Sequence, residues 1–202
     1  RTGGGTYFVC LPKEWASRVG LKKSSHVALS ETPDGRLLLD AKYTAERPPQ
    51  VAVIHPSPLL DREIMGKYLL GYDIIRVEAG ERMSSENREL IKKSSSRLVG
   101  LEIIEEDYSK IVVQFLLEPS AIPPDKILQR EYSIASSMHR DAFTAFIEGD
   151  ERLAKNVVAR DLEVNRLYFL LVRVLRTVVQ RPGLNEKLGV VAIDCLDYRL
   201  AA

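Results

Sequence analysis

Hydrophobic and polar residues follow three different patterns along the chain, and each pattern predicts a different kind of structure. Residues 6–40 hold short runs of β-forming residues separated by Pro, Gly and Asp. Residues 51–115 alternate between short apolar runs and stretches with helical spacing. From residue 124 onward, apolar residues recur every three or four positions. We therefore expect a multi-domain α+β protein, divided into residues 1–47, 48–118 and 119–202.

The first segment predicts a small β-hairpin module. Its expected elements are a strand at 6–11, a short helix at 13–19, and strands at 26–30 and 36–40. The dipeptide Asp34-Gly35 after Pro33 is a hairpin turn signal between the last two strands. About forty residues rarely form a stable core alone, so dimerisation is the simplest way to bury the apolar side chains. These are Val9, Trp15, Val27, Leu29, Leu37 and Leu39.

The second segment predicts a small α/β layer. Its elements follow the order β-α-β-α-β-β, which favours one sheet covered on one side by helices. The stretch 46–50 contains a proline pair and is typical of a stiff linker before this layer. The expected strands are 51–54, 73–77, 101–104 and 110–115, and the expected helices are 59–70 and 86–98.

The third segment predicts an antiparallel helical bundle. The apolar spacing indicates one helix over 124–148, a break at Gly149-Asp150, and a second helix of some thirty residues. A final helix begins near Val190 and reaches Ala202 without a capping signal. We therefore expect the natural bundle to continue past this sequence.

The composition is that of a folded, soluble, cytoplasmic protein, with 45% hydrophobic and 28% charged residues and a formal net charge of +1. The most apolar stretch, 167–179, is interrupted by Arg173 and Arg176, so no membrane insertion is expected. Cys10 and Cys195 are isolated, which favours reduced thiols over a disulfide or zinc site.

No catalytic motif stands out, and we expect a binding protein and not an enzyme. The triplet Gly3-Gly4-Gly5 lacks the lysine and the long helix of a phosphate-binding loop, so a flexible entry to the strand is the simpler interpretation. The sequence contains no GxSxG, no HExxH and no kinase or dinucleotide signature.

Charge is concentrated in the first segment. Residues 1–42 carry seven basic and four acidic residues, a net charge of +3. A basic excess of this size suits contact with a phosphate backbone, and it equally suits a solvated surface that binds nothing. The candidate DNA-contacting residues are Arg1, Lys13, Arg18, Lys22, Lys23 and Arg36.

Acidic residues on the helices are candidate metal ligands. Asp161 lies near the apolar stripe of the long helix, with Asn165 one turn further on. The two side chains could share a divalent or an iron- or zinc-type cation, although one carboxylate and one amide bind metal weakly. An ion pair of Asp161 with Arg140 or Arg199 is the alternative. Further candidates are Asp194 and Asp197, with Glu131 and Asp141 as partial ones.

The first segment resembles a known family. The pieces that carry the resemblance are Gly3-Gly-Gly-Thr-Tyr-Phe-Val-Cys-Leu-Pro-Lys-Glu-Trp15, Gly20-Leu-Lys22, Asp34-Gly35 and Leu37-Leu-Leu39. They are similar to the SpoVT/AbrB-type DNA-binding domain. The resemblance implies a swapped-hairpin homodimer whose first strand, short helix and nearby loops face DNA. The sequence departs from the family at Ser24-Ser25, where a Gly-Asp pair is usual.

The rest of the chain resembles archaeal PhoU-like phosphate-uptake regulators that carry an AbrB-type N-terminus. The pieces are Tyr68-Leu-Leu-Gly-Tyr-Asp-Ile-Ile-Arg-Val77, Arg97-Leu-Val-Gly-Leu-Glu102, Val113-Gln-Phe-Leu-Leu117 and Arg160-Asp-Leu-Glu-Val-Asn-Arg-Leu-Tyr-Phe169. The resemblance implies a helical bundle that restrains phosphate uptake together with a phosphate ABC transporter and its sensor kinase. It also implies metal binding through E/D-x-x-x-D motifs, where Asp161 fits the first position and Asn165 replaces the second acid.

These observations predict a homodimeric regulator of phosphate uptake that binds DNA, transport and signalling partners, or both. Two alternatives remain open. One is an AbrB-type transcription factor whose α/β layer senses a small ligand. The other is a dimeric adaptor that does not bind DNA.

Overall fold

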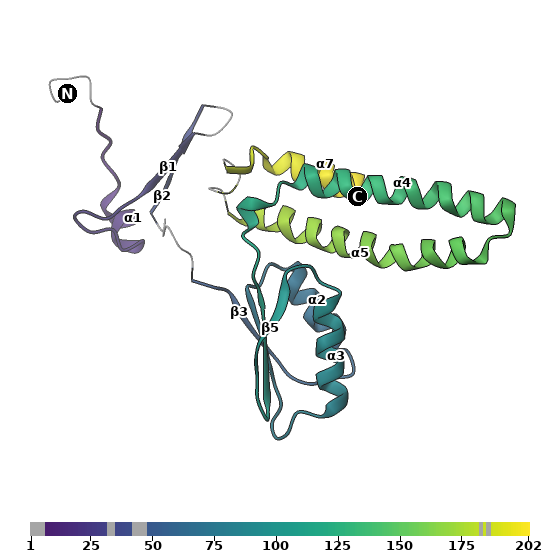
Figure 1. Cartoon of the computed structure of the whole chain (residues 1–202). Coiled ribbons are helices and arrows are strands. Elements are labelled where there is room, and N and C mark those ends of the chain that lie inside the picture. The colour runs from purple at the N-terminus through teal and green to yellow at the C-terminus, as the bar shows by residue number, and fades with distance from the viewer. Residues whose placement is uncertain (1–6, 32–34, 42–47, 182–183, 185–186) are drawn as a thin grey trace. The chain divides into compact units, whose positions relative to one another are not determined.

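The computed structural model of the chain describes residues 7–31, 35–41, 48–181, 184 and 187–202. The chain divides into two compact units, residues 1–48 and residues 49–202 (Figure 1). Among the described residues, no helix combines the length and the apolar composition needed to span a bilayer.

The described part of the first unit contains one short helix and one two-stranded hairpin. Helix α1 covers Lys13–Arg18, and strands β1 (Ala28–Glu31) and β2 (Leu37–Asp40) pair antiparallel. Pro12 precedes α1 and Gly20, with φ +75°, follows it. The elements agree with the sequence pattern, while Pro33 and Asp34 of the expected turn lie outside the described residues.

One expected strand of this unit does not form in the single chain. The described part of the segment, Tyr7 to Leu11, has no strand pairing, and the side chains of Tyr7 and Val9 are 86% and 81% exposed. The prediction of a strand was therefore wrong for the isolated chain. A β-rich sequence becomes a strand only where a neighbouring backbone accepts its hydrogen bonds.

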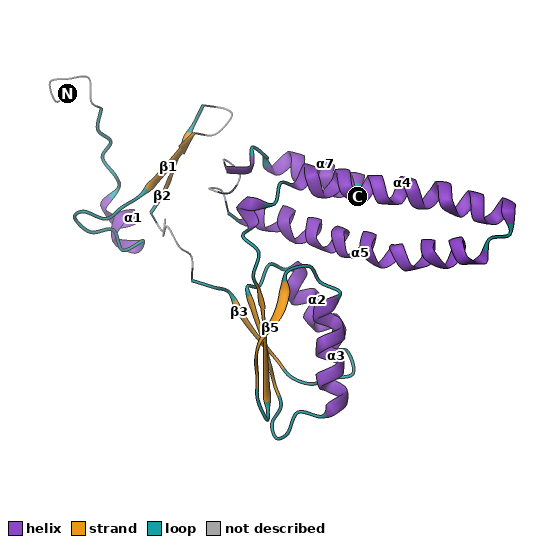
Figure 2. Ribbon diagram, viewed as in Figure 1, coloured by secondary structure: helices purple, strands orange, loops and turns teal. Residues whose placement is uncertain are grey.

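The second unit begins with a four-stranded mixed sheet. Its strands are β3 (Val51–Ile54), β4 (Ile74–Glu78), β5 (Leu101–Glu106) and β6 (Lys110–Phe115), in the order β3-β4-β6-β5. Strands β3 and β4 are parallel and the other pairs antiparallel. Helices α2 (Leu60–Leu69) and α3 (Ser85–Ser96) lie on one face of the sheet (Figure 2). In β3 and β4 every second residue is buried, as expected for strands with one face packed against helices.

Local signals set the ends of these elements. The Ser84 hydroxyl accepts a hydrogen bond from the backbone N–H of Asn87 at 3.2 Å and caps α3. Gly100 precedes β5 with φ +76°, and a Cβ there would lie 2.6 Å from the side chain of Leu117. This turn therefore requires glycine for its backbone angle and for space.

A helical hairpin follows the sheet. The short 3₁₀ helix η1 (Pro119–Ala121) leads into α4 (Pro124–Glu148), and α5 (Glu151–Gln180) runs back beside it. Gly149 ends α4 in the left-handed conformation, and the Asp150 carboxylate accepts a hydrogen bond from the Leu153 N–H at 2.9 Å. The last described helix is α7 (Ala192–Ala201), which packs on α5 and α4.

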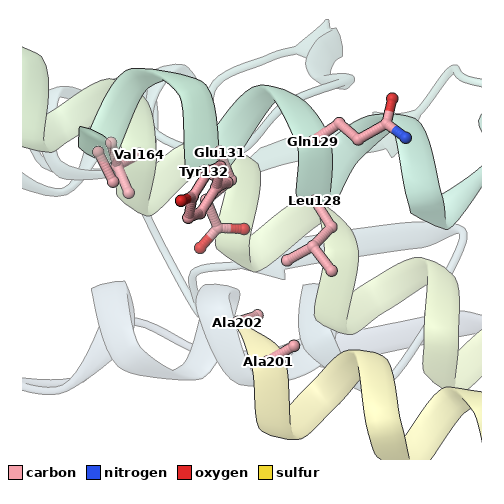
Figure 3. A pocket seen from close by; sticks show the side chains of 8 residues that line it. Leu128, Gln129, Glu131, Tyr132, Val164, Ala201 and Ala202 are labelled. Carbon is pink, nitrogen blue, oxygen red and sulfur yellow. The ribbon is translucent and has the colours of Figure 1, made fainter. Parts of the chain in front are cut away.

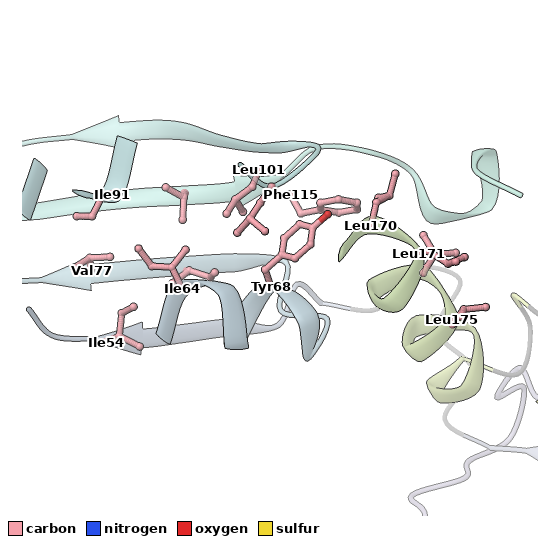
Figure 4. Close-up of a cluster of buried hydrophobic side chains, with 14 of the residues drawn as sticks. Ile54, Ile64, Tyr68, Val77, Ile91, Leu101, Phe115, Leu170, Leu171 and Leu175 are labelled. Atoms are coloured by element: carbon pink, nitrogen blue, oxygen red, sulfur yellow. The ribbon is translucent and has the colours of Figure 1, made fainter. Parts of the chain in front are cut away.

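The sheet and the hairpin share one hydrophobic core. Buried side chains continue from the sheet and α2 through Tyr68 and Phe115 to α5 (Figure 4). The rings of Tyr68 and Phe115 meet edge to face with their centroids 5.9 Å apart. On the α5 side the cluster contains Leu170, Leu171 and Leu175. The second unit is therefore packed continuously from β3 to α7.

A buried arginine lies at the junction of the sheet with α5. Arg173 is 2% exposed, and its Nη1 donates a hydrogen bond to the backbone carbonyl of Tyr68 at 2.6 Å. Its guanidinium carbon lies 3.9 Å from the centroid of the Phe115 ring and 4.9 Å from that of Tyr68. Burial lowers the pKa of Arg173 to about 10, a change opposed by its attraction to Tyr68 and Asp73.

Asp73 connects three parts of this junction. One of its carboxylate oxygens lies 3.9 Å from Arg173 and 3.4 Å from Arg181. The other accepts a hydrogen bond from the backbone N–H of Gln50 at 2.7 Å. One carboxylate therefore ties the residues that precede β3 and β4 to α5.

The fold class predicted from the sequence is confirmed. The chain is mixed α+β, with N-terminal strands, a small α/β region and a helical C-terminal region. The division of residues 48–202 at position 118 stays a prediction.

Candidate functional site

The candidate nucleic-acid-binding residues of the first unit lie on α1 and the loop that follows it. Lys13 is the first residue of α1 and Arg18 the last, and both are exposed. Lys22 and Lys23 follow shortly after the glycine that ends the helical segment, and they are exposed as well. The structure therefore gathers four of the six predicted residues on one helix–loop segment.

Hydrogen bonds define the loop that carries the two lysines. The Lys22 N–H donates to the Ser25 hydroxyl at 2.9 Å, and the Ser25 N–H donates to the Lys22 carbonyl at 3.0 Å. Between them Ser24 has φ +69°. A Gly at this position would adopt that angle without strain, so the loop keeps a glycine-like conformation despite the serine.

The remaining two residues differ in their placement. Arg36 lies next to the first residue of β2 and is exposed. Arg1 lies outside the described residues. Exposed Lys and Arg side chains attract phosphate groups through their charge and carry no base specificity by that contact alone. DNA contact by these residues stays a prediction.

An exposed apolar surface accompanies the basic segment. Tyr7, Phe8, Leu29 and Leu37 are 86%, 71%, 63% and 72% exposed in the single chain. Large apolar side chains exposed on so small a unit leave it with little hydrophobic core of its own in the single chain.

The predicted metal ligands lie on α5 and α7, and three of the four engage neighbouring groups. The Asn165 amide donates a hydrogen bond to the Asp161 carboxylate at 2.8 Å. The Asp194 carboxylate accepts a hydrogen bond from the Val191 N–H at 2.9 Å and caps α7. Asp197 is exposed on the same helix.

The other groups considered for this site also have defined positions. The Asp141 carboxylate is paired with Arg160, and the guanidinium of Arg199 lies 4.9 Å from the centroid of the Tyr168 ring. Throughout the described part of the chain, no group of three or more His, Cys, Asp or Glu side chains is arranged to hold a metal ion. Metal binding by the predicted ligands therefore stays a prediction, and no such group of side chains among the described residues supports it.

A pocket of about 450 Å³ lies between α4, α5 and the end of α7. It is lined by Leu128, Gln129, Glu131, Tyr132, Ala135, Val164, Ala201 and Ala202. Figure 3 shows the carboxyl group of Glu131 pointing into this space. Glu131 is 6% exposed, and burial raises the pKa of its carboxyl group.

We expect the substitution Glu131→Gln to change how stability depends on pH. The raised pKa means that Glu131 favours the folded state in its protonated form, so its contribution is fully present below the unfolded pKa of 4.5 and is lost as pH rises through the folded pKa. The amide that replaces the carboxyl group in the variant stays neutral at every pH. The free energy of unfolding of the variant, relative to the natural chain, should therefore increase between pH 3.5 and pH 7.

Urea denaturation at the two pH values measures this change. The exposed Glu86 provides a control for the loss of one carboxyl group elsewhere, and Glu86→Gln is measured at the same two pH values. The prediction would be contradicted if the free energies of unfolding of the Glu131→Gln variant and the natural chain differed by the same amount at both pH values.

Comparison with known families gives two matches. The model of the PhoU domain family matches residues 128–198. The model of the family described as antidote-toxin recognition MazE, bacterial antitoxin, matches residues 1–48. No curated protein and no solved structure matches the chain significantly.

The two matches correspond to separate parts of the fold. The MazE match covers the unit that holds α1 and the β1–β2 hairpin, and the PhoU match begins in α4 and ends in α7. The sheet of residues 51–115 lies outside both. The chain therefore carries an N-terminal domain of the MazE/AbrB type and a PhoU domain in its C-terminal helices.

Proposed function

We propose that this protein is a homodimeric cytoplasmic regulator of phosphate uptake, and that it acts by binding DNA through its N-terminal domain and a transport or signalling partner through its PhoU domain. The observation that carries the proposal is the presence of a MazE/AbrB-type domain and a PhoU domain in one chain. The proposed mode of action is binding, without covalent chemistry.

The incomplete core of the first unit supports the dimer. The two strands and six helical residues described in this unit cannot bury the apolar side chains that the sequence provides there. A second copy would supply backbone partners for residues 7–11 and cover Tyr7, Phe8 and Leu37. Homodimerisation would also bring two basic segments together, which doubles the number of phosphate contacts available to one complex.

The PhoU domain supports the link to phosphate. It packs on the sheet through a shared core, so a partner bound to the helices would contact a body that is fixed relative to the sheet. That partner is a phosphate transporter or a sensor kinase.

Loss of the protein should impair the control of phosphate uptake. In cells of the source organism that lack the gene, we expect uptake of labelled phosphate to stay high after phosphate becomes abundant. Cells with the gene should reduce their uptake under the same conditions. Restoring the full chain tests whether the change belongs to this protein, and equal uptake with and without the gene would remove phosphate control from the proposal.

The dimer should dissociate when its apolar surface is made charged. The natural chain is expected to sediment at twice 22.7 kDa, and the double variant Val9→Asp/Leu37→Asp at 22.7 kDa, because burying carboxylates at the contact is costly. The double variant Val158→Asp/Leu162→Asp is the matched control, since it places two carboxylates at exposed apolar positions of α5. A natural chain that sediments as a monomer, or a charged hairpin variant that remains a dimer, would exclude this interface.

A further inference from the structure

The pocket beside Glu131 combines apolar walls with one acidic group. Leu128, Ala135 and Val164 form its apolar sides, and Ala201 and Ala202 also line it. It opens at the junction of three helices and has a volume of about 450 Å³, within the range of small-molecule sites.

Glu131 has an unusual environment for a carboxyl group. Its side chain is more than nine-tenths buried, and its Oε2 has no hydrogen-bond partner among the described residues. Figure 3 shows the group directed into the pocket from α4. A buried carboxyl oxygen without a partner destabilises the fold, and native structures usually satisfy such atoms with a ligand, water or ion.

The basic residue next to Glu131 in the sequence and one arginine of α7 are engaged elsewhere. Arg130 pairs with Glu163 at 2.8 Å, and Arg199 lies over the Tyr168 ring. A single carboxyl group is also a poor metal site, because divalent cations take several oxygen ligands. No described group of three acidic, His or Cys side chains surrounds this position. The chemistry therefore favours an organic cation over a metal ion.

We propose that this pocket binds a small organic cation, an alkylammonium whose charged nitrogen pairs with Glu131 and whose apolar body lies against Leu128, Ala135 and Val164. An ammonium group donates hydrogen bonds to the carboxylate, and transfer of the alkyl chain from water to the apolar walls adds to the affinity. The site is independent of the DNA-binding surface, so it stands whether or not the first unit binds DNA.

Calorimetric titration of the full chain at pH 7 with three matched probes tests the proposal. Hexylamine carries a positive charge at this pH, hexanol is neutral and hexanoate is negative, while all three share one apolar body. One molecule of hexylamine is expected to bind per chain. Its affinity should be at least about tenfold higher than that of hexanol, which corresponds to a binding free energy more favourable by at least about 1.4 kcal/mol. Hexanoate should not bind.

Two substitutions separate the charge from the apolar pocket. Glu131→Gln should weaken hexylamine at least about tenfold and leave hexanol unchanged, because only the charge pair is lost. Ala135→Leu should exclude both probes by filling the pocket. Glu163→Gln is the matched control, because Glu163 pairs with Arg130 outside the pocket lining, and it should bind hexylamine as the natural chain does.

Circular dichroism confirms that each variant is folded before titration. The proposal is overturned if the natural chain does not bind hexylamine at millimolar concentration, or binds hexylamine and hexanol equally. It is also overturned if a folded Glu131→Gln variant binds hexylamine with unchanged affinity, or if a folded Ala135→Leu variant does so.

Discussion

Replacing Arg173 with alanine is expected to lower the free energy of unfolding of the second unit by about 3–5 kcal/mol, because removing one member of a buried charged network leaves its partners unsatisfied. The loss has three sources. The Tyr68 carbonyl loses a charged donor, Asp73 loses one of its two arginines, and the rings of Tyr68 and Phe115 lose the guanidinium packed on them. Urea denaturation followed by circular dichroism measures the change.

Two companion variants distinguish the charge of Arg173 from its volume. Arg173→Met fills much of the same space without a charge, so it should cost less than Arg173→Ala. Arg176→Ala removes an exposed arginine from the same helix and should change stability by less than about 0.5 kcal/mol. If Arg173→Ala were as mild as Arg176→Ala, the junction between the sheet and α5 would not depend on this residue.

The triple variant Lys13→Ala/Arg18→Ala/Lys22→Ala is expected to lose most of its affinity for mixed-sequence duplex DNA. In a dimer the substitutions remove six positive charges, and each phosphate contact contributes about 0.9 to the slope of log K against log salt. The slope should therefore become shallower by up to about 5. Titrations at two salt concentrations give both the affinity and the slope.

The matched control removes three exposed lysines from the second unit, through Lys93→Ala/Lys126→Ala/Lys155→Ala. It alters net charge equally and should leave the slope nearly unchanged. Equal effects of the two triple variants would remove α1 and its loop from the DNA-binding surface. A natural chain that does not bind at low salt would instead favour the dimeric adaptor over both DNA-binding alternatives.

Much of the fold followed from the spacing of apolar residues. The strand expected at 51–54 is β3, the strand expected at 110–115 is β6, and the helix expected at 124–148 is α4, each with the same bounds. Within these elements the apolar residues have a regular spacing, and turn-forming residues beside them mark their ends. The antiparallel order of the last two strands also follows from the short connection between them.

The features that could not be predicted from the sequence were the buried charged side chains. Arg173 interrupts an apolar run, which in sequence indicates a solvated position, yet it is buried over two rings contributed by α2 and β6. Glu131 was recognised as a partial metal candidate, but nothing local indicated its unpaired oxygen or the pocket. Both features depend on contacts between segments far apart in the chain, and the local spacing of apolar residues does not indicate such contacts.

Among the described residues, every side chain of the buried cluster comes from residues 54–195, and none comes from the first unit. The first unit thus contributes no side chain to the core that stabilises the second unit. A proline pair at 48–49 lies where the two units join. Such a junction allows each unit to be joined to other domains. A gene that recombined here could exchange one body for another while leaving the N-terminal unit intact.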